Sequence, residues 1–152
     1  MILVLGATGT VGGEVARQLI ASGERPRLLV RNPDKARSFA NSADVVRGDL
    51  DDVASLRTAM RGVDQVFMVA AGSNTVALEA NVVDAAVAEG VKHIVKLSVI
   101  SADAPAITFA QWHHASEEKL KANGLAWTIL RPGNFMTNAL GWAGTIKSDG
   151  NI

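Results

Sequence analysis

Short apolar runs alternate with longer segments of mixed polarity along this chain of 152 residues. The apolar runs predict β-strands over residues 2–5, 27–30, 45–46, 63–70, 93–98 and 125–130. Helices are predicted between them, first from the glycine-rich turn to about residue 22 and then over 33–40, 53–60, 75–89 and 113–122. The joints are short, and the chain contains no linker or repeat beyond this alternation.

The spacing of apolar residues also predicts which side chains are buried. In the first helix, Val11, Val15 and Leu19 recur at steps of four and define one face. The buried face predicted for the helix at 75–89 consists of Val76, Ala80, Val83 and Val87. Trp127, inside the last strand, is expected in the core.

Strands that alternate with helices favour an α/β fold with a mostly parallel sheet covered on both faces. Together with the glycine-rich turn after the first strand, this pattern predicts a doubly wound sheet of strand order 3-2-1-4-5-6. Length and hydrophobic content suit a single domain over 1–152. A ligand is expected outside the carboxyl ends of the strands, where the order reverses between the first and fourth strands.

The turn after the first strand has the pattern G-x-x-G-x-x-G, with glycines at 6, 9 and 12. Gly6 permits a sharp turn, Gly9 a close approach of a pyrophosphate, and Gly12 tight packing of helix on strand. A glycine-rich turn without a ligand is the plainer interpretation, but the position between strand and helix favours nucleotide binding. The expected contacts are Gly6, Thr8, Gly9, Thr10, Val11 and Gly12.

Composition narrows the class of function. The chain has 15 basic and 15 acidic residues without a basic stripe, which argues against binding nucleic acid or a membrane surface. Cysteine is absent, so disulfides and thiolate chemistry are excluded, and the histidine spacing predicts no metal site. No signal peptide or apolar segment of membrane-spanning length is evident, and a cytoplasmic location is expected.

Residues after the second strand predict the choice of cofactor. NAD-preferring folds usually carry an acid there, whereas this chain has Arg31. A guanidinium forms forked, charge-assisted contacts with a 2′-phosphate, so NADP(H) is expected in preference to NAD(H). Asn32 and Lys35 are expected to add contacts. The alternative is that Arg31 is a solvated residue at a strand end.

Several segments come in an order that resembles a known family. They are G-A-T-G-T-V-G, L-L-V-R-N-P-D-K-A, R-G-D-L-D-D, N-V-V-D-A-A-V-A-E-G-V-K-H-I-V and the stretch E-E-K-L to N-F-M-T-N. The chain resembles the atypical short-chain dehydrogenase/reductases, in the NmrA-like and NAD(P)H:quinone-oxidoreductase-like branch, over nearly its whole length. The resemblance implies a Rossmann-type fold. Such proteins continue into a small C-terminal substrate lobe, here missing or truncated, of which residues 141–152 would be the start.

The resemblance also implies further cofactor contacts. Asp49 and Leu50 correspond to contacts at the adenine edge, and the small residues Ala70, Ala71 and Gly72 would pass close to a ribose. Ser98 lies near the position of the family's hydroxyl. Arg131-Pro132-Gly133 resembles a motif at the nicotinamide end, where Pro132 and Phe135 would shape the wall.

The usual proton-transfer pair of the family, Tyr-x-x-x-Lys, has no counterpart, because the chain contains no tyrosine. Counting back from Glu117 places Phe109 and His113 at the two positions. Imidazole titrates near neutral pH, so His113 and His114 are the catalytic candidates, and His113 is also expected to contact the ribose or the nicotinamide of the cofactor. Glu117 follows His113 by one helical turn and is expected to orient its ring. An exposed histidine pair with an ordinary contact is the alternative.

Two functions are consistent with these features. The first is an NADP(H)-dependent oxidoreductase acting on a small quinone or carbonyl-like acceptor, because the nicotinamide carries the reaction and needs no tyrosine. The second is a non-catalytic NADP(H) sensor that reports to a protein partner. A third possibility is an incomplete domain that retains only cofactor affinity.

Overall fold

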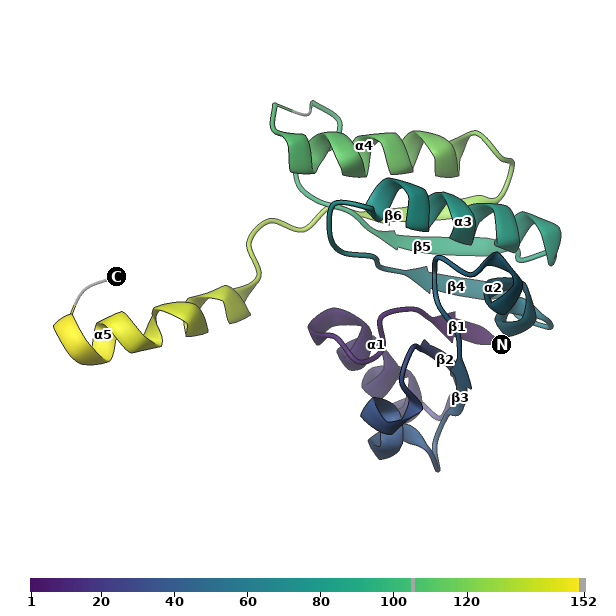
Figure 1. Cartoon of the computed structure of the whole chain (residues 1–152), viewed down its shortest axis with the longest axis horizontal. Coiled ribbons are helices and arrows are strands. Elements are labelled where there is room, and N and C mark those ends of the chain that lie inside the picture. Colours follow the sequence, from purple (N-terminus) through teal and green to yellow (C-terminus); the bar gives the residue numbers. More distant parts are fainter. Residues whose placement is uncertain (105, 151–152) are drawn as a thin grey trace.

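A six-stranded sheet runs through the protein, seen in a computed structural model that describes residues 1–104 and 106–150 (Figure 1). All of its strand pairs are parallel, and the order β3-β2-β1-β4-β5-β6 confirms the predicted topology. The strands are β1 (Ile2–Val4), β2 (Arg27–Val30), β3 (Asp44–Arg47), β4 (Gln65–Met68), β5 (His93–Leu97) and β6 (Ala126–Leu130). Val4 on β1 pairs with Leu28 of β2 on one side and with Phe67 of β4 on the other. The strand order therefore changes direction between β1 and β4.

Helices cover both faces of the sheet, because right-handed crossovers lie on one face from β1 to β3 and on the other face once the strand order has reversed. One face carries α1 (Thr10–Ala21) and the 3₁₀-helix η1 (Pro33–Phe39), and the other carries α2 (Val53–Met60), α3 (Thr75–Ala88) and α4 (Thr108–Lys121). Each face has its own core. Val11, Val15 and Leu19 pack against the core under α1, as predicted.

Local signals explain where several elements begin. The Asp52 side chain accepts hydrogen bonds from the backbone N–H groups of Ala54 and Ser55, and it caps α2. Asn32 caps η1 in the same way, with Pro33 at its first position. The segment at 33–40, predicted simply as a helix, forms a 3₁₀-helix in this short connection.

Two sequence-based expectations about packing and one about a helix start were wrong, although Val83 is buried as predicted. On α3 the buried face contains Glu79, Val82, Val83 and Ala86, whereas Val87 is 47% exposed. This helix is apolar on most sides, so the spacing of its valines did not identify the face toward the sheet. Helix α4 begins at Thr108, one and a half turns before the predicted start. Trp127 is 45% exposed because β6 is an edge strand.

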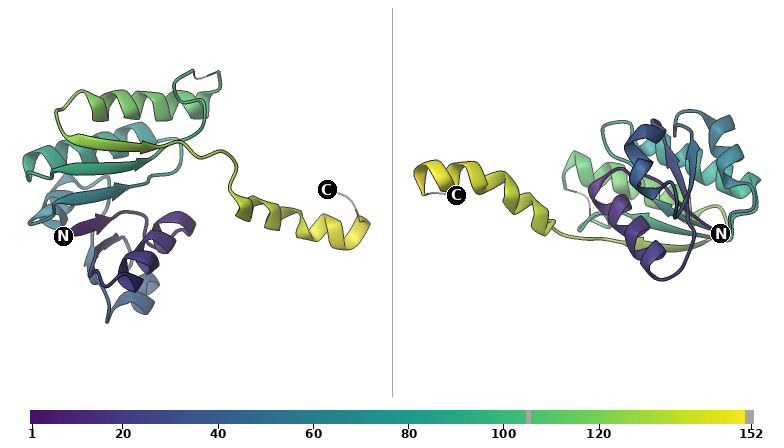
Figure 2. Two further views of the ribbon diagram at one scale, coloured as in Figure 1. Left: turned by 180° about the vertical axis from the view of Figure 1, so that it is seen from behind. Right: turned by 90° about the horizontal axis from the view of Figure 1, so that it is seen from below.

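After β6 the chain leaves the sheet and forms an arm, which consists of the 3₁₀-helix η2 (Met136–Trp142) and α5 (Ala143–Asp149). Figure 2 shows that it projects away from the helices and strands of the sheet. None of its described residues is buried, and Met136 is 92% exposed. That residues 141–152 begin a further lobe stays a prediction, and 151–152 lie outside the described residues. Across the described ranges, no helix combines the length and apolarity needed to cross a membrane.

Candidate nucleotide-binding site

A cavity of about 600 Å³ opens at the carboxyl ends of the strands. Its lining comes from the segments that follow β1 to β5, together with α4 and Phe135. This is the place predicted from the reversal of strand order. Predicted contact residues that line it are Gly6, Thr8, Gly9, Thr10, Val11, Gly12, Arg31, Asp49, Leu50, Ala70, Ala71, Gly72, Ser98 and His113.

The glycine-rich turn forms one wall of the cavity and has no room for larger residues. Gly6 has a φ of +64°, a conformation that favours glycine. A Cβ added to Gly12 would lie 2.8 Å from the Leu5 carbonyl oxygen and closer still to that of Gly6. The start of α1 therefore lies so close to the backbone of Leu5 and Gly6 that only glycine fits at position 12.

The N-terminus of α1 faces this turn. The first N–H groups of an α-helix have no partner within the helix, and the cap residue Gly9 has no side chain to accept them. Residues Thr10, Val11 and Gly12 line the cavity at this point. The helix dipole adds a positive potential there, so the wall is suited to an anion such as a diphosphate.

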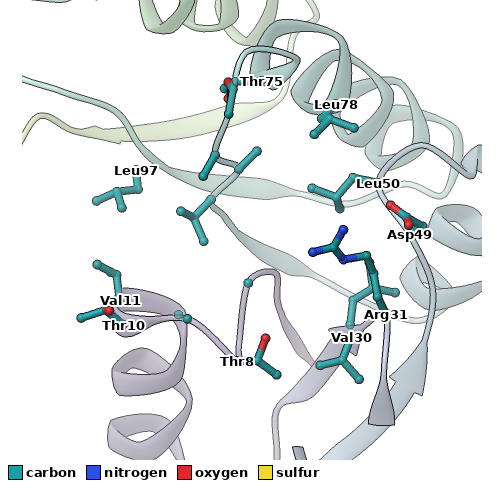
Figure 3. Close-up of a pocket in the computed structure, with 18 of the residues that line it drawn as sticks. Thr8, Thr10, Val11, Val30, Arg31, Asp49, Leu50, Thr75, Leu78 and Leu97 are labelled. Carbon is teal, nitrogen blue, oxygen red and sulfur yellow. Dashed lines mark hydrogen bonds between the residues drawn. The ribbon is translucent and has the colours of Figure 1, made fainter. Parts of the chain in front are cut away.

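Arg31 extends the cavity on the side of β2. It follows the last residue of the strand, and Figure 3 shows its guanidinium group reaching into the space below Leu50. Asp49 and Leu50 form the neighbouring wall after β3. Their loop is fixed by the Asn81 amide, which donates to the Leu50 carbonyl at 3.0 Å, and by the Ser55 hydroxyl, which accepts from the Asp49 N–H at 3.0 Å.

Four predicted site residues lie outside the cavity lining: Asn32, Lys35, His114 and Pro132. The Asn32 oxygen accepts from the Asp34 N–H and caps η1, and Lys35 is exposed on that helix. The Pro132 carbonyl accepts from the Ile100 N–H at 2.8 Å. His114 follows His113 on α4. Successive residues of an α-helix are rotated by about 100° about its axis, so His114 lies on another side of the helix than His113. Cavity residues that the sequence did not suggest include Leu29, Thr75, Leu78 and Leu97.

At the far end of the cavity, Phe109 and His113 lie on the first turns of α4. Their rings meet edge to face with centroids 4.9 Å apart. His113 is only 7% exposed. Burial and, to a lesser extent, the positive charge of Lys96 lower the pKa of His113 to about 4, against the opposing effect of the Glu117 charge. The ring is therefore neutral at pH 7.

Glu117 does not orient the His113 ring, contrary to the prediction. Its carboxylate accepts from the Ser98 hydroxyl at 2.5 Å and from Nε and Nη2 of Arg131 at 3.0 and 2.5 Å. Burial raises the pKa of Glu117, but these hydrogen bonds and the Arg131 charge outweigh it and hold the pKa at about 2. The Ser98 hydroxyl group therefore donates its hydrogen bond to Glu117 and has no second proton for a ligand, although Ser98 lines the cavity.

A second buried pair was missed from the sequence. Lys96 on β5 is 0% exposed, and its ammonium group donates to Oε2 of Glu79 on α3, which is 1% exposed. A lysine between the apolar residues Val95 and Leu97 of this strand was the available signal, since charged residues are almost never fully buried unless they are paired. Among residues 1–104 and 106–150, no three potential metal-ligating side chains are grouped together.

Comparison with known proteins supports the interpretation of this geometry. The family model described as NAD(P)H-binding matches residues 6–151. The chain belongs to this NAD(P)H-binding family of atypical short-chain dehydrogenase/reductases. The earlier resemblance and the Rossmann-type fold are thereby confirmed.

Several relatives are reductases. The chain is 40% identical over 154 residues to a (4-alkanoyl-5-oxo-2,5-dihydrofuran-3-yl)methyl phosphate reductase of Streptomyces griseus, covering 100% of the chain and 54% of the relative. It is 38% identical over 156 residues to an NAD(P)H azoreductase of Xenophilus azovorans, with coverage of 100% and 54%. A solved Escherichia coli NADPH-dependent quinone oxidoreductase in complex with NADPH superposes with a TM-score of 0.90 at 30% identity, over 99% of this chain and 55% of that one.

The chain therefore spans about half the length of these relatives. The shared half contains the glycine-rich turn and the cavity. The chain thus belongs to a family that includes NAD(P)H-dependent reductases.

Proposed function

We propose that this chain binds NADPH in the cavity and supports hydride transfer to a quinone or a similar small acceptor. The observation that carries the proposal is Arg31 on the cavity wall, one strand away from the α1 N-terminus. A guanidinium group beside an anion-binding turn suits a nucleotide with both a diphosphate and a 2′-phosphate. The related Escherichia coli quinone oxidoreductase, solved with NADPH, lends support.

Successive groups of residues along the cavity match successive parts of such a nucleotide. The N–H groups at the start of α1 would hold the diphosphate, and Arg31 would hold the 2′-phosphate. Asp49 and Leu50 would contact the adenine edge, and the small residues Ala70 and Ala71 would allow a ribose to approach. The aromatic end, with Phe109 and His113, would receive the nicotinamide.

The bound nicotinamide would supply a hydride, and a quinone that takes up this hydride and one proton becomes a hydroquinone. The chain would contribute the position of the two reactants rather than acid catalysis. Phe109 has no proton to give, and the low pKa of His113 leaves its ring neutral at pH 7. The proton would therefore come from solvent.

Nucleotide titration tests the cofactor assignment. The Arg31→Ala variant should bind NADPH about tenfold or more weakly, because hydrogen bonds to charged groups contribute about 1.5–3 kcal/mol. NADH binding should change by less than about twofold, since NADH lacks the phosphate. Calorimetry with both nucleotides measures the two affinities.

Arg25→Ala is the matched control. Arg25 precedes β2 at the opposite end of the strand, where its guanidinium donates to the Asn41 carbonyl at 3.3 Å. This variant should bind both nucleotides as the wild type does. Equal losses of NADPH and NADH affinity in Arg31→Ala would overturn the role of Arg31, and no binding of either nucleotide by the wild type would overturn the proposal.

A nucleotide sensor is the second candidate. It is favoured by the absence of tyrosine from the sequence and by the neutral His113, which leave Phe109 and His113 without an acid poised near pH 7. Steady-state oxidation of NADPH with a panel of quinones and azo dyes separates the two functions. Turnover supports the oxidoreductase, whereas tight binding of NADPH without turnover supports the sensor.

A further inference from the structure

A buried ion pair lies beneath the nicotinamide end proposed for the cavity, outside the residues that the proposed function uses. Lys96 and Glu79 are 0% and 1% exposed, and they come from β5 and α3. Removing both charges from water is costly, and well-packed apolar residues often stabilise such a position as well or better. The pair is therefore poorly explained by stability alone.

The Lys96 ammonium group has a second neighbour that links it to the cavity. Its Nζ lies 3.5 Å from Nδ1 of His113, which lines the cavity from α4. An ammonium group has donors and no acceptor, so the Nδ1 atom that faces it must be the acceptor. In a neutral ring the proton is then on Nε2.

We propose that Lys96, held in place by Glu79, is a positioning residue that fixes His113 as a neutral imidazole with its proton on Nε2. The ring then presents a single N–H donor to a ligand at this end of the cavity. The part that concerns the ligand rests on the proposed NADPH function, whereas the protonation and tautomer of His113 do not depend on any ligand.

The charges around His113 are consistent with this assignment. Lys96 from β5 is the nearest cation, and its charge is balanced by Glu79 from α3. Glu117 lies one turn further along α4, but its carboxylate is occupied by Ser98 and by Arg131 from the segment after β6. The Arg131 guanidinium group thus offsets part of the Glu117 charge, which opposes the lowering of the His113 pKa without reversing it.

Nitrogen NMR of the ligand-free chain tests the tautomer directly. Two-bond ¹H–¹⁵N correlation spectra distinguish the two neutral forms and the cation, and His93→Gln and His114→Gln variants assign the signals. His113 should show a protonated Nε2 and an unprotonated Nδ1 from pH 8 down to about pH 5. A protonated Nδ1, or a titration of His113 near its ordinary pKa of about 6.5, would overturn the inference.

A double variant tests whether Lys96 sets this state. Glu79→Gln with Lys96→Met replaces the pair by neutral side chains of similar size, so neither charge is left buried without its partner. The pKa of His113 should rise, and the fixed tautomer should give way to a mixture. Asp64→Asn with Lys92→Met removes an exposed pair, whose Nζ and Oδ1 atoms lie 2.6 Å apart, and should leave the His113 spectrum unchanged.

An unchanged His113 spectrum in the Glu79→Gln/Lys96→Met variant would show that Lys96 does not set the tautomer. If this variant does not fold, the spectra of the wild-type chain still decide the protonation state. The role of Lys96 is then tested with Lys96→Met alone, in which Glu79, whose pKa is raised by burial, can take up a proton so that no unpaired charge is left. This variant should shift the His113 signals while Lys92→Met does not.

Nucleotide fragments separate this inference from the proposed function. His113→Leu should weaken NADPH binding about tenfold, as expected when a ligand acceptor loses its donor, and should leave 2′,5′-ADP binding unchanged because that fragment lacks the nicotinamide half. His113→Gln keeps an N–H donor and should restore most of the affinity. Unchanged NADPH binding in His113→Leu would contradict the contact between His113 and the ligand. Failure of the wild-type chain to bind either NADPH or 2′,5′-ADP would contradict only the proposed function.

Discussion

The Arg131 guanidinium group and the Glu117 carboxylate form a two-pronged pair, with Nε to Oε1 at 3.0 Å and Nη2 to Oε2 at 2.5 Å. Glu117 is fully buried on α4, and Arg131 directly follows the edge strand β6. The Ser98 hydroxyl, after β5, donates to the same carboxylate. One side chain thus links α4 to the ends of two neighbouring strands beside the cavity.

Removing this carboxylate should be costly for stability. In Glu117→Gln, the partly exposed Arg131 loses its buried counter-charge and keeps only Asp103, at 3.1 Å, and the free energy of unfolding should fall by about 2–4 kcal/mol. Urea unfolding at pH 7 measures it. Glu118→Gln is the matched control, because its exposed carboxylate pairs with Lys121 at 2.8 Å and should contribute less than about 1 kcal/mol. Equal effects of the two substitutions would contradict the structural role of Glu117.

The free energy of unfolding should fall as the pH is lowered, in two separate pH ranges. His113 and Glu117 both have a lower pKa in the folded chain, about 4 and about 2, than in the unfolded one, so the unfolded state binds more protons as the pH falls. The His113 contribution is complete above about pH 6.5 and is lost toward pH 4. The Glu117 contribution is complete above about pH 4.5 and is lost toward pH 2. Each is on the order of 3 kcal/mol.

Urea unfolding across pH 3–8 checks these windows. His113→Gln should flatten the dependence between about pH 6.5 and 4, and Glu117→Gln should flatten it below about pH 4.5. Above pH 7 each variant's curve should run parallel to that of the wild type. Because the raised pKa of the buried Glu79 acts in the opposite direction, the difference between His113→Gln and the wild type is the decisive quantity. Curves of equal slope between about pH 6.5 and 4 would contradict the buried, neutral state of His113.

The glycine turn should not tolerate a methyl group at position 12. The Cβ of Gly12→Ala would lie 2.8 Å from the Leu5 carbonyl oxygen, so α1 must move away from β1. We expect a loss of at least about 1–3 kcal/mol in unfolding free energy and loss of NADPH binding. Thermal unfolding and calorimetry measure the two effects.

Gly144→Ala is the control for the glycine substitution. Gly144 lies in α5, and a Cβ there would meet nothing within 4 Å. This variant should change stability by less than about 1 kcal/mol, in the stabilising direction, because alanine is the better helix former. Wild-type stability and NADPH affinity in Gly12→Ala would show that the close contact of turn and helix is unimportant.

Reversing the charge at position 31 should reverse nucleotide preference. In Arg31→Asp the carboxylate would repel a 2′-phosphate and would accept a hydrogen bond from a ribose 2′-hydroxyl. NADPH affinity should fall by more than in Arg31→Ala, and NADH should become the preferred ligand. Competition titration with both nucleotides measures the preference, and an NADPH preference that survives in Arg31→Asp would place the phosphate elsewhere.

The local sequence determined most of the fold. Alternating apolar runs and amphipathic segments gave the strand order, because a strand, a glycine turn and a helix of these lengths permit few right-handed arrangements. Residues directly after strands, such as Arg31 and Asp49, were predicted to face the ligand because parallel strands end at one edge of the sheet. The structure brings both residues to the cavity.

The packing between elements was decided only in three dimensions. The spacing of His113 and Glu117 on one helix suggested that they interact, yet the carboxylate is bound by Ser98 and Arg131, which lie 19 and 14 residues away in sequence. The partner of His113 is Lys96, from a strand 17 residues earlier. A sequence shows which residues share a helix face, but the register between a helix and the sheet beneath it depends on the summed packing of both surfaces. That packing decides which charges meet.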